Sequence, residues 1–158
     1  MANDGGITAQ LEQFIADTLA AMQSGGENVF RTADVYKYQI SADAGGIEAF
    51  SRYEPFAFVS YWPAGDAARE GDYDLRQVWR FAILIGIEST GDGVARIGDA
   101  NHLGASKIRD LVIAGLDGQH PGGDLDCDEL YYTGETELLD SPKKYAFEMH
   151  FTTNRVGD

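Results

Sequence analysis

The sequence predicts an α+β fold, with a mainly antiparallel, mixed β-sheet, a long β-hairpin and two helices packed on one face. Two segments repeat apolar residues at helical spacing, several others alternate apolar and polar residues as strands do, and the order is helix, strands, helix, strands. Helices and strands grouped in this way indicate α+β. With 158 residues, 44% of them hydrophobic, the chain is expected to form a single domain over residues 1–158.

The first predicted element is an amphipathic helix over residues 7–24. Apolar side chains recur three or four residues apart along it: Ile7, Leu11, Phe14, Ile15, Leu19 and Met22. We expect Thr8 to cap its start and the pair Gly25 and Gly26 to end it. The following segment, residues 27–40, is rich in Val, Phe and Tyr and predicts one broken strand or two short strands.

A long antiparallel hairpin is predicted next, from PFAFVSYWP at residues 55–63 and DLRQVWRFAILIGIES at residues 74–89, joined by a nine-residue polar loop. The second strand is apolar on both faces in its later half, which indicates burial on two sides. Fourteen extended residues would reach about 46 Å, whereas a domain of this size is about 40 Å across. We therefore expect the hairpin to cross the molecule and to project toward a partner.

The rest of the chain is predicted to hold one further helix and two strands. GDGVARIG, residues 91–98, is interpreted as a turn because it matches no phosphate-binding glycine motif. The helix is expected over residues 99–118 with Gly118 at its end. An acid-rich loop over 118–129, a short strand over 129–135 and a last strand over 144–153 follow.

Charge is the feature in which this chain departs most from an average domain, at a formal net charge of −14. No Lys or Arg occurs between Arg109 and Lys143, where nine acidic residues accumulate. We expect one strongly negative surface and no nucleic-acid binding, since binding to phosphates requires a basic face.

The acidic segment contains one candidate metal site. Asp124, Asp126, Asp128 and Glu135 occupy positions 1, 3, 5 and 12 of a calcium-binding loop. The position that requires glycine holds Glu129. Adventitious binding of a divalent cation and a simply solvated loop therefore remain alternatives, and no cofactor is expected.

No catalytic residue can be assigned from motifs. The sequence has no G-x-S-x-G, H-E-x-x-H or Walker loop, and its three histidines share no metal spacing with Cys127. His150, expected on the polar face of the last strand, is the histidine most suited to being held by neighbours. The longest apolar run, Phe81 to Ile87, is too short to span a bilayer, and no secretory signal is recognisable, so we expect a cytoplasmic protein.

Two aromatic pairs, Tyr61–Trp62 and Tyr131–Tyr132, occur in predicted strands. Because neighbouring side chains in a strand point to opposite faces, one member of each pair is expected to point outward. An outward aromatic residue at a strand end is often part of a protein interface.

Three segments give the chain a likeness to a known family: ITAQLEQFIADTLAAMQ, the strand PFAFVSYWP with its loop and RQVWRFAILIGIES, and KIRDLVIAGLDGQ before KYAFEMHFTT. In order of elements and apolar spacing the chain resembles the tail-terminator, or tail-completion, proteins of tailed bacteriophages, including the Mu-like prophage type. The resemblance covers most of the chain. It implies a structural protein without catalysis that forms a ring, commonly a hexamer, at the end of the tail tube.

This resemblance also implies partners and a location: copies of the same chain, the tail tube, and the proteins that connect tail and head, first in the host cytoplasm and then in the virion tail. The acidic segments 66–72 and 124–137 would then face the channel or an end of the ring, where negative charge avoids holding DNA. Residues of the hairpin are the expected interface or lumen residues: Asp66, Arg69, Glu70, Asp72, Arg76 and Trp79.

Two other functions remain open on sequence alone. A small ligand-binding or enzymatic α+β domain would require a deep pocket with perturbed titratable groups. An acidic inhibitor that mimics nucleic acid would spread its carboxylates over one face.

Overall fold

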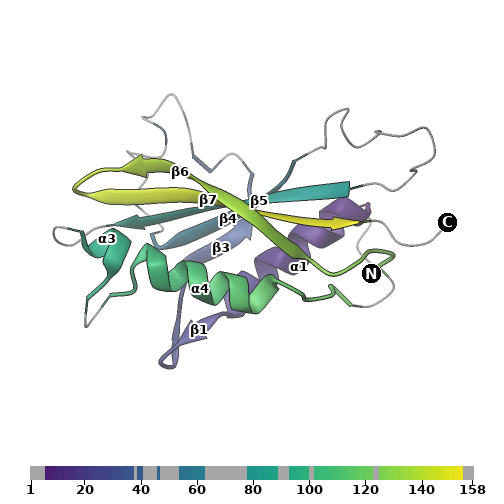
Figure 1. Ribbon diagram of the computed structural model, residues 1–158, viewed down its shortest axis with the longest axis horizontal. Coiled ribbons are helices and arrows are strands. Elements are labelled where there is room, and N and C mark those ends of the chain that lie inside the picture. Colours follow the sequence, from purple (N-terminus) through teal and green to yellow (C-terminus); the bar gives the residue numbers. More distant parts are fainter. Residues whose placement is uncertain are drawn as a thin grey trace.

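Two helices cover one face of a mixed β-sheet in the computed structural model of this chain (Figure 1). The structure describes residues 6–37, 39–40, 46, 54–62, 78–88, 93–99, 102–122 and 125–154. Among the described strands, β3 (Thr32–Val35), β4 (Phe56–Trp62), β5 (Val78–Glu88), β7 (Lys144–Asn154) and β6 (Tyr131–Asp140) form a five-stranded sheet in that order, in which β3 is parallel to β4 and all other neighbours are antiparallel. The strands β1 (Gln23–Ser24) and β2 (Glu27–Asn28) form a separate two-stranded sheet. The predicted α+β class, with a mixed and mainly antiparallel sheet, is confirmed.

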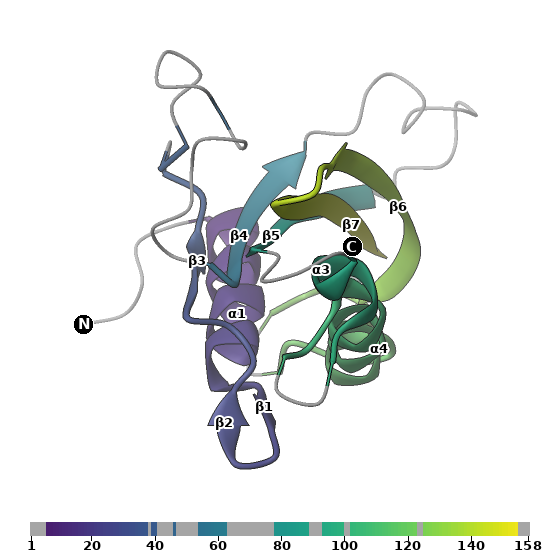
Figure 2. The ribbon, with the colours of Figure 1, turned by 90° about the vertical axis from the view of Figure 1, so that its left-hand side faces the viewer.

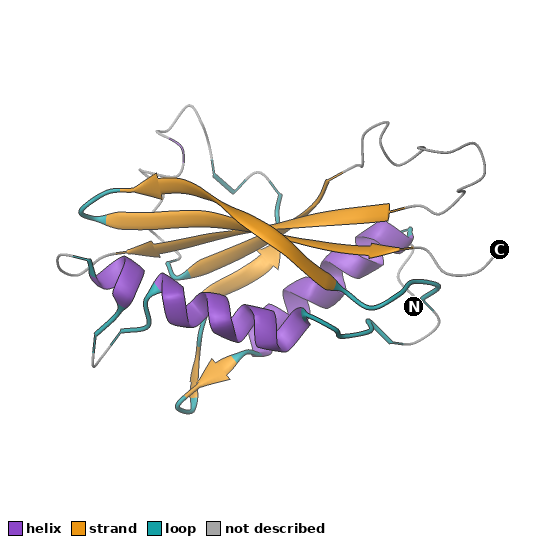
Figure 3. Ribbon diagram, viewed as in Figure 1, coloured by secondary structure: helices purple, strands orange, loops and turns teal. Residues whose placement is uncertain are grey.

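Figure 3 shows the distribution of helices and strands along this fold. The elements are α1 (Ile7–Ala21), β1 (Gln23–Ser24), β2 (Glu27–Asn28), β3 (Thr32–Val35), β4 (Phe56–Trp62), β5 (Val78–Glu88), α3 (Val94–Ile97), α4 (Ala105–Leu116), β6 (Tyr131–Asp140) and β7 (Lys144–Asn154).

The first helix differs from its prediction at both ends. Gly6 is the N-cap residue and Thr8 lies inside α1, so the expected Thr8 cap is wrong. The helix ends at Ala21, and Gly25 and Gly26 instead form the turn between β1 and β2. Both glycines have positive φ, 61° and 85°, which a two-residue turn of this kind requires and which glycine adopts without steric cost. The predicted two short strands in residues 27–40 are β2 and β3.

The predicted hairpin is present as β4 and β5, which pair antiparallel from Phe56 with Gly86 to Trp62 with Arg80. The expected burial on two sides of the second strand is also confirmed, because Ala82 and Gly86 on one face and Ile83 on the other are all buried. Residues 74–77 and the connecting loop lie outside the described residues, so the projection of the hairpin stays a prediction.

The helix predicted over residues 99–118 begins later in the structure than predicted. The short helix α3 lies in the segment interpreted as a turn, and α4 begins only at Ala105. Between them the backbone at Gly98 and Gly104 approaches so closely that a Cβ on Gly104 would lie 2.3 Å from the nitrogen of Gly98. A continuous helix could not bring these two glycines together. The predicted end is confirmed, since α4 stops before Gly118, which has a φ of 77°.

The acidic segment is not one loop. The strand predicted over 129–135 extends to Asp140 as β6, with register irregularities after Tyr132 and after Glu137. Glu135 and Glu137 are therefore strand residues. The predicted last strand is confirmed as β7, and it pairs antiparallel with β6.

The hydrophobic core lies between the sheet and the two long helices. Figure 2 shows the ribbons of α1 and α4 on one side of the sheet. The sheet face that packs on α1 and α4 is called the helix face, and the opposite face the outer face. Alternate residues of the central strands are buried on the helix face: Phe81, Ile83 and Ile85 of β5, and Phe147 and Met149 of β7. They pack against buried residues of the two helices: Leu11, Ile15 and Leu19 of α1, and Ile108 and Val112 of α4.

We expect Gly86→Ala to destabilise the fold. A Cβ on Gly86 would lie 2.3 Å from the ring of Phe56, which is itself fully buried and cannot move aside. Forcing a methyl group into such packing costs about 1–3 kcal/mol of unfolding free energy, measurable by chemical denaturation. Gly115→Ala in α4 is the matched control, because its Cβ would meet only the mobile end of Met22 and alanine favours the helix. Equal stability of the two variants would contradict the packing described for Gly86.

Candidate functional site

The expected interface residues of the hairpin fall into two groups. Asp66, Arg69, Glu70, Asp72 and Arg76 lie outside the described residues. Trp79 is 5% exposed and belongs to the hydrophobic core, because it shares the helix face of β5 with Phe81. The expectation that Trp79 contacts a partner or a channel is therefore wrong for the folded chain.

The structure separates the members of the candidate calcium loop that it describes. Asp126 is exposed, and the backbone of Asp128 bonds to the end of β7, whereas Glu135 points toward α4. Asp124 lies outside the described residues. Among the residues that the structure describes, no group of three or more His, Cys, Asp or Glu side chains is arranged to hold a metal ion.

Glu135 takes part in a network that fastens α4 to the sheet. The Nε of Arg109 in α4 lies 2.6 and 2.7 Å from the two carboxylate oxygens of Glu135, and the Tyr132 hydroxyl donates to the same carboxylate at 2.6 Å. The guanidinium also stacks over Phe147, 5.0 Å from the ring centroid. Burial and the bond to Glu135 raise the pKa of Tyr132 to about 12. Every charged group here has a partner within the chain, so the network is structural.

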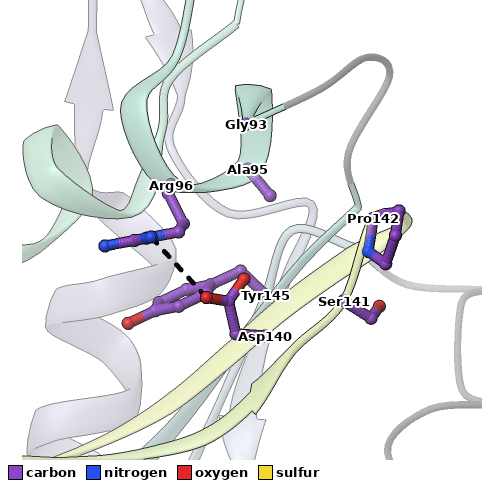
Figure 4. Close-up of a pocket in the computed structure, with 7 residues that line it drawn as sticks. All are labelled: Gly93, Ala95, Arg96, Asp140, Ser141, Pro142 and Tyr145. Atoms are coloured by element: carbon purple, nitrogen blue, oxygen red, sulfur yellow. Dashed lines mark ion pairs between the residues drawn. The ribbon is translucent and has the colours of Figure 1, made fainter.

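Figure 4 shows a pocket of about 340 Å³ between α3 and the turn that joins β6 to β7. Tyr145 lies beneath Arg96, whose guanidinium is 5.9 Å from the ring centroid. Arg96 also pairs with Asp140 at 3.6 Å, which is longer than a hydrogen-bonded ion pair. Gly93, Ala95, Ser141 and Pro142 complete the lining. The pocket offers one cation and one carboxylate over an aromatic floor.

The most deeply buried charges are Glu54 and Lys144, which meet next to the outer face. The Lys144 ammonium lies 2.5 Å from Oε1 of Glu54, and the two side chains are 4% and 1% exposed. Apart from this ion pair, the Glu54 carboxylate has no hydrogen-bond partner among the residues that the structure describes. Burial raises the pKa of Glu54, while Lys144 acts in the opposite direction. Neither residue was a candidate from sequence, because they are ninety positions apart and only the sheet brings them together.

Part of the outer face is open, and its exposed end carries large side chains. Trp62 of β4 pairs in register with Arg80 of β5, Arg80 pairs with Thr152 of β7, and Thr152 pairs with Tyr131 of β6. We call these four residues the open row. Trp62 is 47% exposed and Tyr131 41% exposed, and Arg80 is exposed as well. The predicted outward members of the two aromatic pairs are thus confirmed, and they lie on the same row.

His150 lies on the outer face next to the open row, two residues before Thr152 on β7. Its Nε2 lies 2.8 Å from a carboxylate oxygen of Glu148, and its ring is 5.3 Å from that of Trp62. The expectation that neighbours hold His150 is confirmed. The ring pair limits the orientations open to the Trp62 indole.

Cys127 and His120 organise the loop that precedes β6. Cys127 is buried at 3% exposure, and burial raises the pKa of its thiol. His120 donates from Nε2 to the carbonyl oxygen of Cys127 and accepts at Nδ1 from the N–H of Gly122. These contacts explain the loop without a metal or a catalytic thiolate.

Comparison with known proteins finds no relative: no protein-family model and no curated protein matches this chain. None of the helices within the described ranges combines the length and the apolar character needed to cross a membrane.

We expect Lys144→Met to lower the free energy of unfolding by about 3–5 kcal/mol near neutral pH, because it leaves the Glu54 carboxylate buried without a counter-charge. Lys143→Met, at the exposed neighbouring position, is the control and should be nearly neutral. Denaturant unfolding of both variants measures the difference.

The pairing of Glu54 with Lys144 also predicts how the loss of unfolding free energy in Lys144→Met, which we call the deficit, depends on pH. The pKa of Glu54 is already raised in the folded chain and rises further without Lys144. Below pH 4.5, the ordinary pKa of Glu54, this carboxyl group is neutral in both the folded and the unfolded chain. Lys144→Met therefore lowers the free energy of unfolding least there. The deficit of Lys144→Met relative to Lys143→Met should grow as pH rises through the folded pKa. A difference independent of pH would contradict this account.

Cys127 should react with a thiol reagent only when the chain opens. Its thiol is buried and stays protonated at neutral pH, and the thiolate is the reactive form. Labelling of the folded chain should be much slower than labelling in denaturant, with free cysteine as the control. Equal rates would show that the loop does not cover the thiol.

Proposed function

We propose that this chain is a non-catalytic structural subunit that associates with copies of itself into a ring of the phage tail-terminator type. Such a ring closes the end of a tail tube and joins it to the head, with tube and head-tail connector proteins as further partners. The subunit would be made in the host cytoplasm and end in the virion tail.

The observation that carries the proposal is the open row. Trp, Tyr and Arg are the residue types that contribute most to binding at protein interfaces, and here one of each is exposed on the same edge of one sheet face. An exposed sheet face of this composition suits another protein surface better than a small molecule, which binds in a concave site.

The arrangement of elements is consistent with the resemblance seen in the sequence. The three segments that carry it include α1, the β4–β5 hairpin, α4 and β7, and these elements together form the sheet and its helical cover. The buried charges among the described residues are paired within the chain, at Glu54 with Lys144 and at Glu135 with Arg109. This supports a structural role over a catalytic one.

The surplus of acid fits a channel that must pass DNA without holding it. Asp117 is exposed at the end of α4, Asp126 is exposed in the loop before β6, and the whole chain carries a net charge of −14. Negative walls repel phosphates, so DNA moves past without displacing counterions.

A second candidate function is the binding of a small ligand in the pocket under Arg96. The long Arg96–Asp140 separation would let a ligand with neighbouring positive and negative groups enter between them. Isothermal titration with free amino acids, using Arg96→Met as the control variant, would detect it.

The proposal predicts a closed oligomer. Light-scattering mass over a range of concentrations should reach several subunits, and negative-stain images should show a ring with a central hole. Trp62→Ala should weaken the association by about 2 kcal/mol, while Ile97→Ala, at a side chain 80% exposed on α3, should not. An assembled fraction made of compact particles without a hole would count against the ring.

A further inference from the structure

The five-stranded sheet has two edge strands, β3 on one side and β6 on the other (Figure 2). Within the described part of the chain, no further strand pairs beyond either of them. An edge strand presents backbone N–H and C=O groups that can pair with an extended segment of another chain. The two edges of this sheet differ in whether those groups are available.

The β3 edge is closed by side chains of its own segment. The N–H of Val35 donates to a carboxylate oxygen of Asp34 at 2.7 Å, and the carbonyl of Val35 accepts from the side-chain amide of Gln39 at 2.9 Å. Because the N–H of the next residue, Tyr36, donates to β4, the groups of Val35 are those that point away from the sheet. With four residues, β3 leaves little backbone for a partner.

The β6 edge keeps backbone groups available over its middle. At the turn, Lys144 exchanges two backbone hydrogen bonds, of 2.9 and 3.3 Å, with the residue that follows β6. Lys144 and every second residue after it therefore turn their backbone groups toward β6, whereas Phe147 and Met149 turn theirs toward β5. The register partners of these two residues, Glu137 and Glu135, point their own N–H and C=O groups away from the sheet.

This middle part of β6 is regular and exposed. Residues 134–137 pair with β7 without interruption, between the two register irregularities of the strand. The side chains of Thr136 and Glu137 are exposed, and Leu138 is 42% exposed. An added antiparallel strand would form about four backbone hydrogen bonds with this stretch, two at Glu135 and two at Glu137.

The charge of this edge selects the partner. Glu137 is exposed and forms no ion pair with any residue that the structure describes. The other two acidic residues of the strand, Glu135 and Asp140, are paired with arginines of the helices, and β6 itself contains no Lys or Arg. Two β6 strands side by side would place Glu135 of one copy opposite Glu137 of the other, so a second copy is disfavoured and a basic segment is favoured.

We infer that the β6 edge binds an extended basic segment of another protein by strand addition. The backbone of that segment pairs with Glu135 and Glu137, and a Lys or Arg side chain lies beside Glu137 on the helix face. The inference goes beyond the proposed function, because a single subunit presents the same edge whether or not a ring forms.

A short peptide that alternates Lys and Val is the probe for this edge. One control has Glu in place of Lys, and the other is the Lys peptide N-methylated at alternate residues, which keeps its charge but cannot pair as a strand. The unmodified Lys peptide should bind at least about tenfold more tightly than either control in a calorimetric titration, because N-methylation removes several backbone hydrogen bonds. Equal binding of the N-methylated peptide would reflect attraction to the net charge of −14 alone and would overturn the inference.

Amide hydrogen exchange locates the contact on the strand. In the free chain, the N–H groups of Glu135 and Glu137 point outward and should exchange faster than that of Thr136, which points toward β7. The Lys peptide should slow the exchange of Glu135 and Glu137. Protection elsewhere on the chain without protection at these two amides also contradicts strand addition.

Glu137→Pro, compared with Glu137→Gln, separates the backbone from the charge. Proline removes the outward N–H at a position that an edge strand tolerates, and it should abolish binding of the Lys peptide. Glutamine removes the charge alone and should weaken binding about threefold. Circular dichroism confirms that each variant is folded, and if the proline variant is not, the N-methylated peptide and the exchange measurement still decide.

The outcomes separate this inference from the proposed function. Unchanged peptide binding by a folded Glu137→Pro variant overturns the inference. If this variant lowers the light-scattering mass of the chain without peptide, the edge joins two copies of the chain and the inference is also wrong. Peptide binding by a chain that stays monomeric supports the inference and contradicts the ring.

Discussion

The pairing of β5 with β7 is the interaction on which the rest of the fold depends. The two strands pair without irregularity over eleven residues each, from Val78 with Asn154 to Glu88 with Lys144. One side of this ladder supplies the aromatic and aliphatic residues that pack under α1 and α4. The other side aligns the outer face, including both Lys144 and the open row. A shift of one residue would exchange the two faces and destroy both at once.

The two faces of the β5–β7 ladder differ in residue composition, and they therefore contribute to the structure in different ways. The helix face is a continuous apolar layer. At its margin, the charged side chains of Arg109 and Glu135 pair with each other. The outer face divides into a buried part, where Phe56 and Phe58 stack with centroids 4.9 Å apart, and an open part that ends in Trp62 and Arg80. The buried part contributes to stability, whereas the open part contributes little to it and is available for a partner.

The position of an acidic residue in this fold decides whether its carboxylate is paired within the chain or exposed at the surface. Within the described residues, carboxylates that enter the fold are paired, as Glu54 is with Lys144 and Glu135 with Arg109. Others, such as Asp126 and Glu129, stay exposed at the surface. Arg80 is also exposed, and it pairs in register with Trp62 on the outer face.

The sequence by itself determined the fold class, the types and approximate positions of the long elements, and that one residue of each aromatic pair points outward. Each of these follows from periodicity within a short segment, which is local information. The sequence did not reveal the close approach of Gly98 and Gly104, which of the two aromatic residues points outward, the extent of β6 or the location of Trp79, because a close approach of two backbones, a partner strand and the choice of buried face all depend on distant residues. The tertiary structure alone decided that Glu54 meets Lys144 and that Trp62, Arg80, Thr152 and Tyr131 share one row. Those neighbours come from four strands, and only the register of the sheet aligns them.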